Sequence, residues 1–204
     1  MPSPRTRENV TERIDLPPPY TLVRLRESGE AFAHALEIAG ESGAGTLVYV
    51  GRFDLAEFAV VLEPTEPLHT ARRAFYAGMV AVADALRAYA PPNKPVMIHW
   101  PDAVRVDGGL VGGGRLGWPK SVRENEQPPW LVFGAMIRTV AMTETEAGVH
   151  PLASALQEDC SAQPSRSVKW LSTLPVAYRL VCAVSEREAR NKTKTALRCI
   201  MSGP

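Results

Sequence analysis

The sequence has few cysteines and no long hydrophobic run. Its three cysteines, Cys160, Cys182 and Cys199, are spaced like neither a disulfide framework nor a zinc site. The longest nearly continuous apolar run, Leu55 to Leu62, is much shorter than the roughly 20 residues of a transmembrane helix. The N-terminal Met-Pro-Ser-Pro-Arg lacks the apolar core of a secretory signal. These absences predict a cytoplasmic protein that does not span a membrane.

An excess of charge of one sign is missing as well. The chain has 23 Lys and Arg against 22 Asp and Glu, which gives a net charge of +1. Such a balance disfavours nucleic acid or a membrane surface as the partner of the whole chain. Hydrophobic residues make up 45% and charged residues 22%, as in ordinary globular proteins. The composition therefore predicts a folded domain of mixed helices and strands.

The charge is distributed unevenly along the chain. Residues 161–204 carry 8 Lys and Arg but only 2 Asp and Glu, a net charge of +6, so the first 160 residues have −5. This basic segment is rich in Ser and Thr and lacks a sustained apolar period. One interpretation is that the segment results from a shifted reading frame or an alternative end, and the other is that it is a divergent extension. In both cases we expect it to add little to the core. Residues 1–19 hold five prolines and predict an extended arm, which leaves 20–160 as the main domain.

Hydrophobic periodicity predicts alternating strands and helices over that domain. Helices are expected over 30–39, ending at Gly40, and over 69–89, where apolar residues recur at steps of three and four. Asp107-Gly108-Gly109 lies between β-branched residues and predicts a hairpin. Strands are expected over 20–26, 46–50, 56–62, 96–100, 104–106, 110–114 and 130–142, and a helical start over 152–157.

Glycines gather in one part of the sequence. Six of the 15 lie between Gly108 and Gly117, and three of them, Gly112, Gly113 and Gly114, are consecutive. Glycine inside a strand lets a ligand or another backbone approach closely, and bare N–H groups can bind a carboxylate or phosphate. A bulged hairpin packed beneath a helix would need glycines too. Both interpretations stay open from glycine content alone.

Two motifs in succession resemble a known family. His99-Trp100-Pro101-Asp102, followed by Val106-Asp-Gly-Gly-Leu-Val-Gly-Gly-Gly114, resembles the biotin/lipoate A/B protein ligases, in a divergent bacterial form. Those enzymes carry Lys-Trp-Pro-Asn-Asp, a hairpin and a glycine-containing strand. The resemblance covers about residues 20–160. It implies an α+β fold, with a mixed, mostly antiparallel sheet and helices packed on one side of it.

The resemblance also implies an activity. Family members attach biotin, lipoate or octanoate to a lysine of a biotinyl- or lipoyl-type carrier protein, through an adenylate made from ATP with Mg²⁺. Asp102 would hold Mg²⁺ or a ligand nitrogen, and Trp100 with Gly112–Gly114 would line the ligand. Carboxylate or phosphate would be held by cationic side chains, of which Arg138, Arg115 and His99 are the catalytic candidates and Arg52 a ligand-binding one. Arg138 follows Gly134 by four, so both should point to one face of a strand, with Gly134 clearing space.

Departures from the family pattern leave three functions open. Gly109 takes the place of the family's ligand-contacting lysine, His99 replaces the first lysine of the Trp-Pro motif, and the loop that closes over the adenylate is reduced to Gly51-Arg52. Arginine supplies charge to a phosphate but does not readily donate a proton. Residues 1–159 hold no cysteine, which disfavours transfer through a thioester. The chain is then an adenylate-forming ligase, a non-catalytic binder of the same ligand, or a domain without a ligand.

Overall fold

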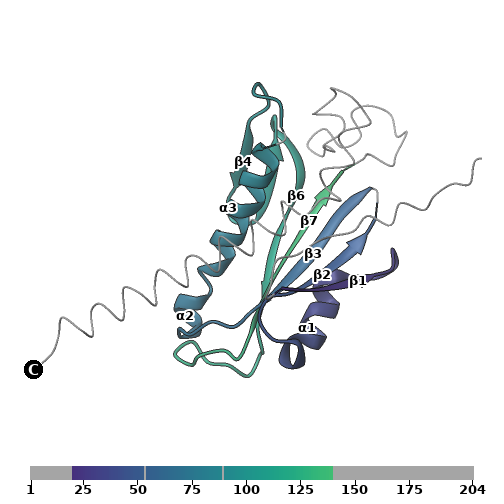
Figure 1. Ribbon diagram of the computed structural model, residues 1–204. Coiled ribbons are helices and arrows are strands. Elements are labelled where there is room, and N and C mark those ends of the chain that lie inside the picture. The colour runs from purple at the N-terminus through teal and green to yellow at the C-terminus, as the bar shows by residue number, and fades with distance from the viewer. Residues whose placement is uncertain (1–19, 53, 89, 140–204) are drawn as a thin grey trace, which may run out of the picture.

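One sheet of seven strands organises the chain (Figure 1). The computed structural model describes residues 20–52, 54–88 and 90–139. The order across the sheet is β1-β2-β3-β7-β6-β5-β4. The strands are β1 (Thr21–Leu25), β2 (Thr46–Gly51), β3 (Leu55–Leu62), β4 (Val96–His99), β5 (Ala103–Val106), β6 (Gly109–Gly117) and β7 (Leu131–Arg138), and the helices are α1 (Ala31–Ser42), α2 (Leu68–Ala71) and α3 (Ala74–Arg87).

The pairing of the strands confirms the predicted fold class. β1 and β2 run parallel, joined by the crossover through α1, and every other neighbouring pair in this sheet is antiparallel. A parallel pair needs such a crossover, whereas antiparallel strands can be joined by short turns. The result is the mixed, mostly antiparallel sheet expected from the sequence.

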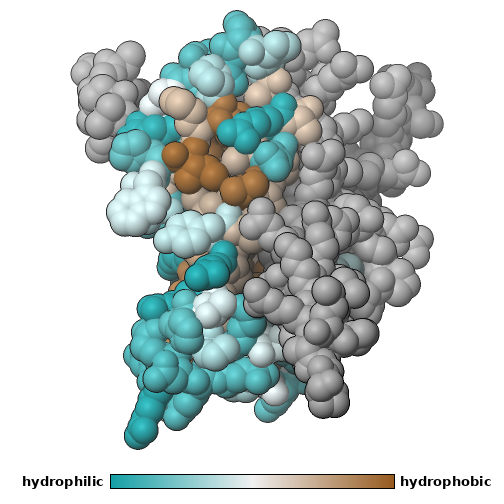
Figure 2. Space-filling model, turned by 90° about the vertical axis from the view of Figure 1, so that its left-hand side faces the viewer, coloured by the Kyte–Doolittle hydropathy of each residue, from teal (hydrophilic) through white to brown (hydrophobic). Residues whose placement is uncertain are grey.

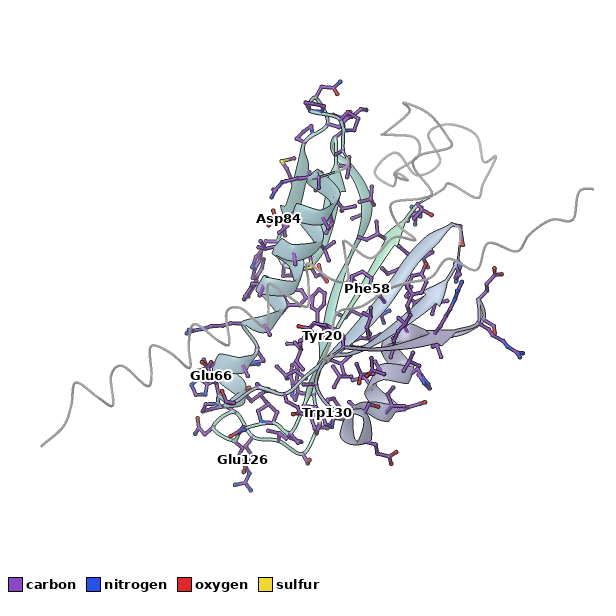
Figure 3. The ribbon with its side chains drawn as sticks, viewed as in Figure 1. Tyr20, Phe58, Glu66, Asp84, Glu126 and Trp130 are labelled. Carbon is purple, nitrogen blue, oxygen red and sulfur yellow. The ribbon has the colours of Figure 1, made fainter. Side chains whose placement is uncertain are left out.

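The helices lie on both faces of the sheet, so the expectation of helices on one side was wrong (Figure 1). Alternate residues of β2 and β3 belong to two separate buried clusters. Val48 and Ala59 pack with α1, whereas Leu47 and Phe58 pack in the cluster of α3. Because neighbouring side chains of a strand point to opposite faces, α1 and α3 cover opposite faces. Figure 3 labels Phe58, which belongs to the cluster of α3, within the sheet, and Trp130, which precedes β7, near α1.

Both predicted helices exist, with different bounds. α1 continues through Gly40 and ends at Ser42, and the next residue, Gly43, has a φ of +74° that suits glycine. The predicted helix over 69–89 is interrupted at Arg72 and Arg73, where tighter bonds such as Phe75 N–H to the Arg72 carbonyl replace the α-helical pattern. Other predictions lie outside the described residues: the arm over 1–19, Tyr89, the end of the strand over 130–142, the helical start over 152–157 and the segment 161–204.

Apolar side chains are exposed on the side of the molecule that carries α3. Tyr76 is 50% exposed and Val80 is 40% exposed, one helical turn apart on that helix. Figure 2 shows hydrophobic side chains gathered on this side, with hydrophilic ones around them. None of the described helices is long and apolar enough to cross a bilayer.

Candidate functional site

The predicted glycine hairpin is present, and it contains a bulge. β5 and β6 pair through Val106 with Gly109 and through Val104 with Gly112, and the register shifts between these pairs. Asp107 and Gly108 both have positive φ, as a two-residue hairpin turn requires. A bulge turns the strand locally and re-aims its side chains. It lies at the place where the sequence predicted a ligand.

The Trp-Pro-Asp motif forms the turn between β4 and β5. Its peptide bond between Trp100 and Pro101 is cis. The carbonyl of Asp102 accepts a hydrogen bond of 2.9 Å from the Gly114 N–H, which ties the motif to the glycine strand. The sheet therefore brings the two motifs together. Trp100 is 74% exposed, and its contact with a ligand stays a prediction.

Packing explains much of the glycine cluster. A Cβ on Gly112 would collide with the carbonyl oxygen of Met136, and one on Gly113 with that of Asp102. A Cβ on Gly114 would lie 2.6 Å from the sulfur of Met79 in α3. The bulged hairpin beneath a helix thus accounts for these glycines. Their contact with a ligand stays a proposal.

Arg52 is held by a neighbouring carboxylate in the β2–β3 turn. Its Nη2 lies 2.9 Å and its Nε 3.2 Å from the two oxygens of Asp54. This hydrogen-bonded pair lowers the pKa of Asp54 and raises the pKa of Arg52, to which the charges of Glu57 and Glu27 add. The Thr139 N–H donates to the Asp54 carbonyl at 2.9 Å, which anchors the turn beside the end of β7.

Arg115 and Arg138 lie on the same face of the sheet but differ in their contacts. Arg115 lies 3.6 Å from Glu30 and its guanidinium stands 5.1 Å from the ring centre of Phe32, both at the start of α1. Arg138 ends β7, is exposed, and has no hydrogen-bonding or ionic partner among the described residues. The space expected at Gly134 is filled by Phe32, 2.5 Å from where a Cβ would lie.

Comparisons with known proteins give this site its context. The sequence model of the biotin/lipoate A/B protein ligase family matches residues 16–170. The chain belongs to this family. A biotin protein ligase-like protein of unknown function from Silicibacter sp. TM1040 is 27% identical, with a TM-score of 0.72, over 90% of this chain and 77% of the other. No curated protein sequence matches the chain.

Two structures of the Aquifex aeolicus biotin protein ligase share the fold. The apo structure is 19% identical with a TM-score of 0.62, over 83% of this chain and 71% of that one. The complex with biotin and ATP is 18% identical with a TM-score of 0.57, over 82% and 72%. At these identities, the likeness establishes the common architecture of the family.

One buried acidic residue was missed by the sequence analysis. Glu57 lies within β3, is 4% exposed, and accepts a hydrogen bond of 2.6 Å from the Ala31 N–H at the start of α1. The signal was available, since Glu57 is the one charged residue in the apolar run from Leu55 to Leu62. Its partner lies 26 residues earlier, so no local pattern identifies it.

Arg24 was missed as well. Its guanidinium lies across Gly51, where a Cβ would stand 3.0 Å from Nη2. Arg24 and Gly51 line a hollow of about 380 Å³ with Leu25, Arg26 and Glu27. The Arg-x-Arg alternation at the end of a predicted strand was the signal for this group.

The described residues do not form a complete metal site. No group of three or more His, Cys, Asp or Glu side chains is close enough to hold an ion anywhere in the described ranges. Mg²⁺ often uses only one or two carboxylates together with substrate phosphates. The exposed Asp102 is chemically suited to be one such carboxylate. A protein-held Mg²⁺ without a nucleotide would not fit here.

Proposed function

We propose that this protein binds an acyl acid of the biotin or lipoate class and attaches it to a lysine of a carrier protein through an acyl-adenylate. The supporting observation is Arg138. It ends β7 on the same face as Arg115 and is free of acidic partners among the described residues. β6 lies between it and the Trp-Pro-Asp turn. We also propose that the protein acts in the cytoplasm.

The proposed reaction has two steps, and the first of them requires cationic side chains. In the first step the acyl carboxylate attacks the α-phosphate of ATP and pyrophosphate leaves. In the second, the carrier lysine attacks the acyl carbon and AMP leaves. Negative charge develops on the phosphate oxygens in the first step, and fixed cations stabilise it. Arg138 would hold the phosphate or carboxylate through its paired N–H groups, and His99 and Arg115 would contact other parts of the ligands. Mg²⁺, held by Asp102 and the phosphates, would neutralise further charge.

A non-catalytic binder is the second candidate, and Gly109 favours it. The residue that matches the family's lysine is a glycine at the start of β6, which has no side chain to reach a ligand. Arg52 and Arg115 already have acidic neighbours at 2.9 and 3.6 Å. If Arg138 does not replace the lysine, the chain would bind the acid without activating it.

Pyrophosphate release with ATP and biotin, lipoate or octanoate tests the proposal. Arg138→Ala should lower the rate by about 10²–10³-fold, as loss of one transition-state donor does elsewhere. Arg123→Ala is the matched control, because Arg123 is an exposed arginine in the loop before β7. Rapid release from Arg138→Ala would contradict the role of Arg138. Calorimetric binding of an acid, without release from the unmodified chain, would support the binder.

A further inference from the structure

Two arginines at the edge of the sheet lack a partner among the described residues. β1 is an edge strand (Figure 1), and Arg24 and Arg26 lie at its carboxyl end. Both side chains are exposed, and neither makes a hydrogen bond or an ion pair with another described residue. Arg52, in the neighbouring turn, differs because Asp54 lies 2.9 Å from it. The end of β1 therefore carries positive charge that no ion pair in the described part of the chain neutralises.

Gly51 allows the guanidinium of Arg24 to lie close against β2. A Cβ on Gly51 would stand 3.0 Å from Nη2, 3.4 Å from Nε and 3.6 Å from Cζ of Arg24. The guanidinium thus lies across the glycine, in space that a side chain at this position would take. β1 and β2 run parallel with Leu25 beside Val50, so Gly51 follows the last paired residue of β2. An arginine supported in this way loses less freedom when its N–H groups bind an anion.

The supported guanidinium borders a hollow. The hollow has a volume of about 380 Å³, and the described residues around it are Arg24, Leu25, Arg26, Glu27 and Gly51. Small-molecule sites have volumes of about 300–1,000 Å³, so the hollow has room for a small ligand or for one side chain of a larger partner. Two arginines and one glutamate give this lining a net charge of +1. A ligand group with a single negative charge would balance it.

A carboxylate fits this lining better than a phosphate does. Arginine can donate two parallel hydrogen bonds to the two oxygens of a carboxylate. A phosphate group carries about −1.5 to −2 charges at neutral pH, more than the lining balances. The carboxylate of Glu27, which pairs with neither arginine, would also repel a phosphate more strongly than a carboxylate. The chemistry of the hollow therefore favours a singly charged acid.

The hollow is separate from the candidate site. Leu22 and Tyr49 pack in the cluster of α3, so the alternation along β1 places Arg24 on that face of the sheet. Arg115 and Arg138 lie on the opposite face. β2 and β3 lie between β1 and β7, which at about 4.8 Å for each step places β1 roughly 14 Å from β7. A small ligand beside Arg138 would therefore leave the hollow free.

We propose that Arg24, supported by Gly51 and assisted by Arg26, binds a carboxylate group in this hollow. The carboxylate belongs either to a free small acid or to an acidic side chain of a protein, and both present the same chemistry to the guanidinium. This second site goes beyond the proposed function, because it requires no adenylate. Pyrophosphate release tests the proposed function, whereas binding of a simple carboxylate tests the second site.

NMR titration of the full chain with sodium acetate is the test. Acetate should shift the amide signals of Leu25 and Gly51. Arg24→Gln should weaken this binding by about 10-fold or more, because hydrogen bonds to a charged group are lost. Gly51→Ala keeps every charge but displaces the guanidinium, so it should also weaken binding. Arg73→Gln is the matched control, since Arg73 is an exposed arginine that precedes α3, and it should leave binding unchanged.

A second probe distinguishes the two sources of the carboxylate. Acetylated Gly-Glu-Gly amide presents a glutamate side chain. Tighter binding of this peptide than of acetate would indicate an acidic side chain of a protein, and equal or weaker binding would indicate a free acid. The inference would be overturned by absence of shifts with both probes, by equal shifts in Arg24→Gln or Gly51→Ala, or by tighter binding of inorganic phosphate. Unchanged thermal unfolding of both variants would show that the fold is intact.

Discussion

At the scale of single residues, Arg52 and Asp54 set the charge of the β2–β3 turn. The pKa of Asp54 lies below its ordinary value of 3.8 because Arg52 donates hydrogen bonds to it. The stabilisation is therefore complete above the unfolded pKa, near 3.8, and is lost as the pH falls through the lower folded pKa. Between pH 5 and 7 the turn should carry a neutral pair, with the exposed Arg24 and Arg138 as further cations beside it.

Asp54→Asn tests this pair. The variant should lose about 0.2–1 kcal/mol of unfolding free energy at neutral pH, the usual range for a partly exposed ion pair. The difference from the unmodified chain should shrink as the pH falls through the folded pKa of Asp54, which lies below 3.8, because the carboxyl is then protonated in both states. Urea unfolding at several pH values measures it. A difference that persists unchanged to pH 2 would mean that the hydrogen-bond geometry, and not the charge, stabilises the turn.

Single residues were predicted from the sequence only where a motif marks them. Asp102 came from the family resemblance and Gly112–Gly114 from the clustering of glycines, and the sheet does bring them together. Glu57 was missed because its importance depends on the Ala31 N–H, a contact between distant segments. The pairing of Arg115 with Glu30 was invisible for the same reason. A sequence pattern shows residue types and the hydrophobic periodicity. It does not show which residue, distant in sequence, pairs with a charged side chain.

At the scale of elements, glycines set how closely helices approach the sheet. A Cβ on Gly78 in α3 would collide with the ring of Phe133 in β7, whereas one on Gly40 in α1 would stand 3.8 Å from Trp130. Gly78→Ala should therefore destabilise the fold by about 1–3 kcal/mol through overpacking. Gly40→Ala, in an exposed helix position, should stabilise it by up to about 1 kcal/mol. Thermal unfolding compares the pair, and a stabilising Gly78→Ala would refute this account of the packing.

Most elements were predictable because their signals are local. The strands over 46–50 and 56–62 follow from β-branched runs, and the hairpin from Asp107-Gly108. The interruption at Arg72 and Arg73 was not predictable, since the apolar period continues through it. The division of the helices between two faces also escaped prediction. It depends on which alternate residues of β2 and β3 meet which helix, and both sets are apolar.

At the scale of the whole molecule, strand order creates the candidate site. β7 lies between β3 and β6, although β3 and β7 are separated by three intervening strands in sequence. This placement puts Arg138 between the Arg52–Asp54 turn on one side and the glycine strand on the other. The motifs in the sequence predicted the candidate residues, whereas their neighbours in space follow from the order of the strands in the sheet. The family resemblance, and not the composition, carried that prediction.

The basic C-terminal part of the chain is expected to lie outside the family domain. The family match ends at residue 170, whereas the change in composition begins at 161. Both faces of the described sheet already carry a helix, α1 on one and α3 on the other. Residues beyond 170 should therefore add little stability. A chain ending at 170 should unfold within about 4 °C of the full chain, which corresponds to roughly 1 kcal/mol for this size.

A chain ending at 160 then tests whether the intervening ten residues belong to the domain. Global unfolding of the 170-residue chain, seen by circular dichroism, would show that the basic segment is part of the core.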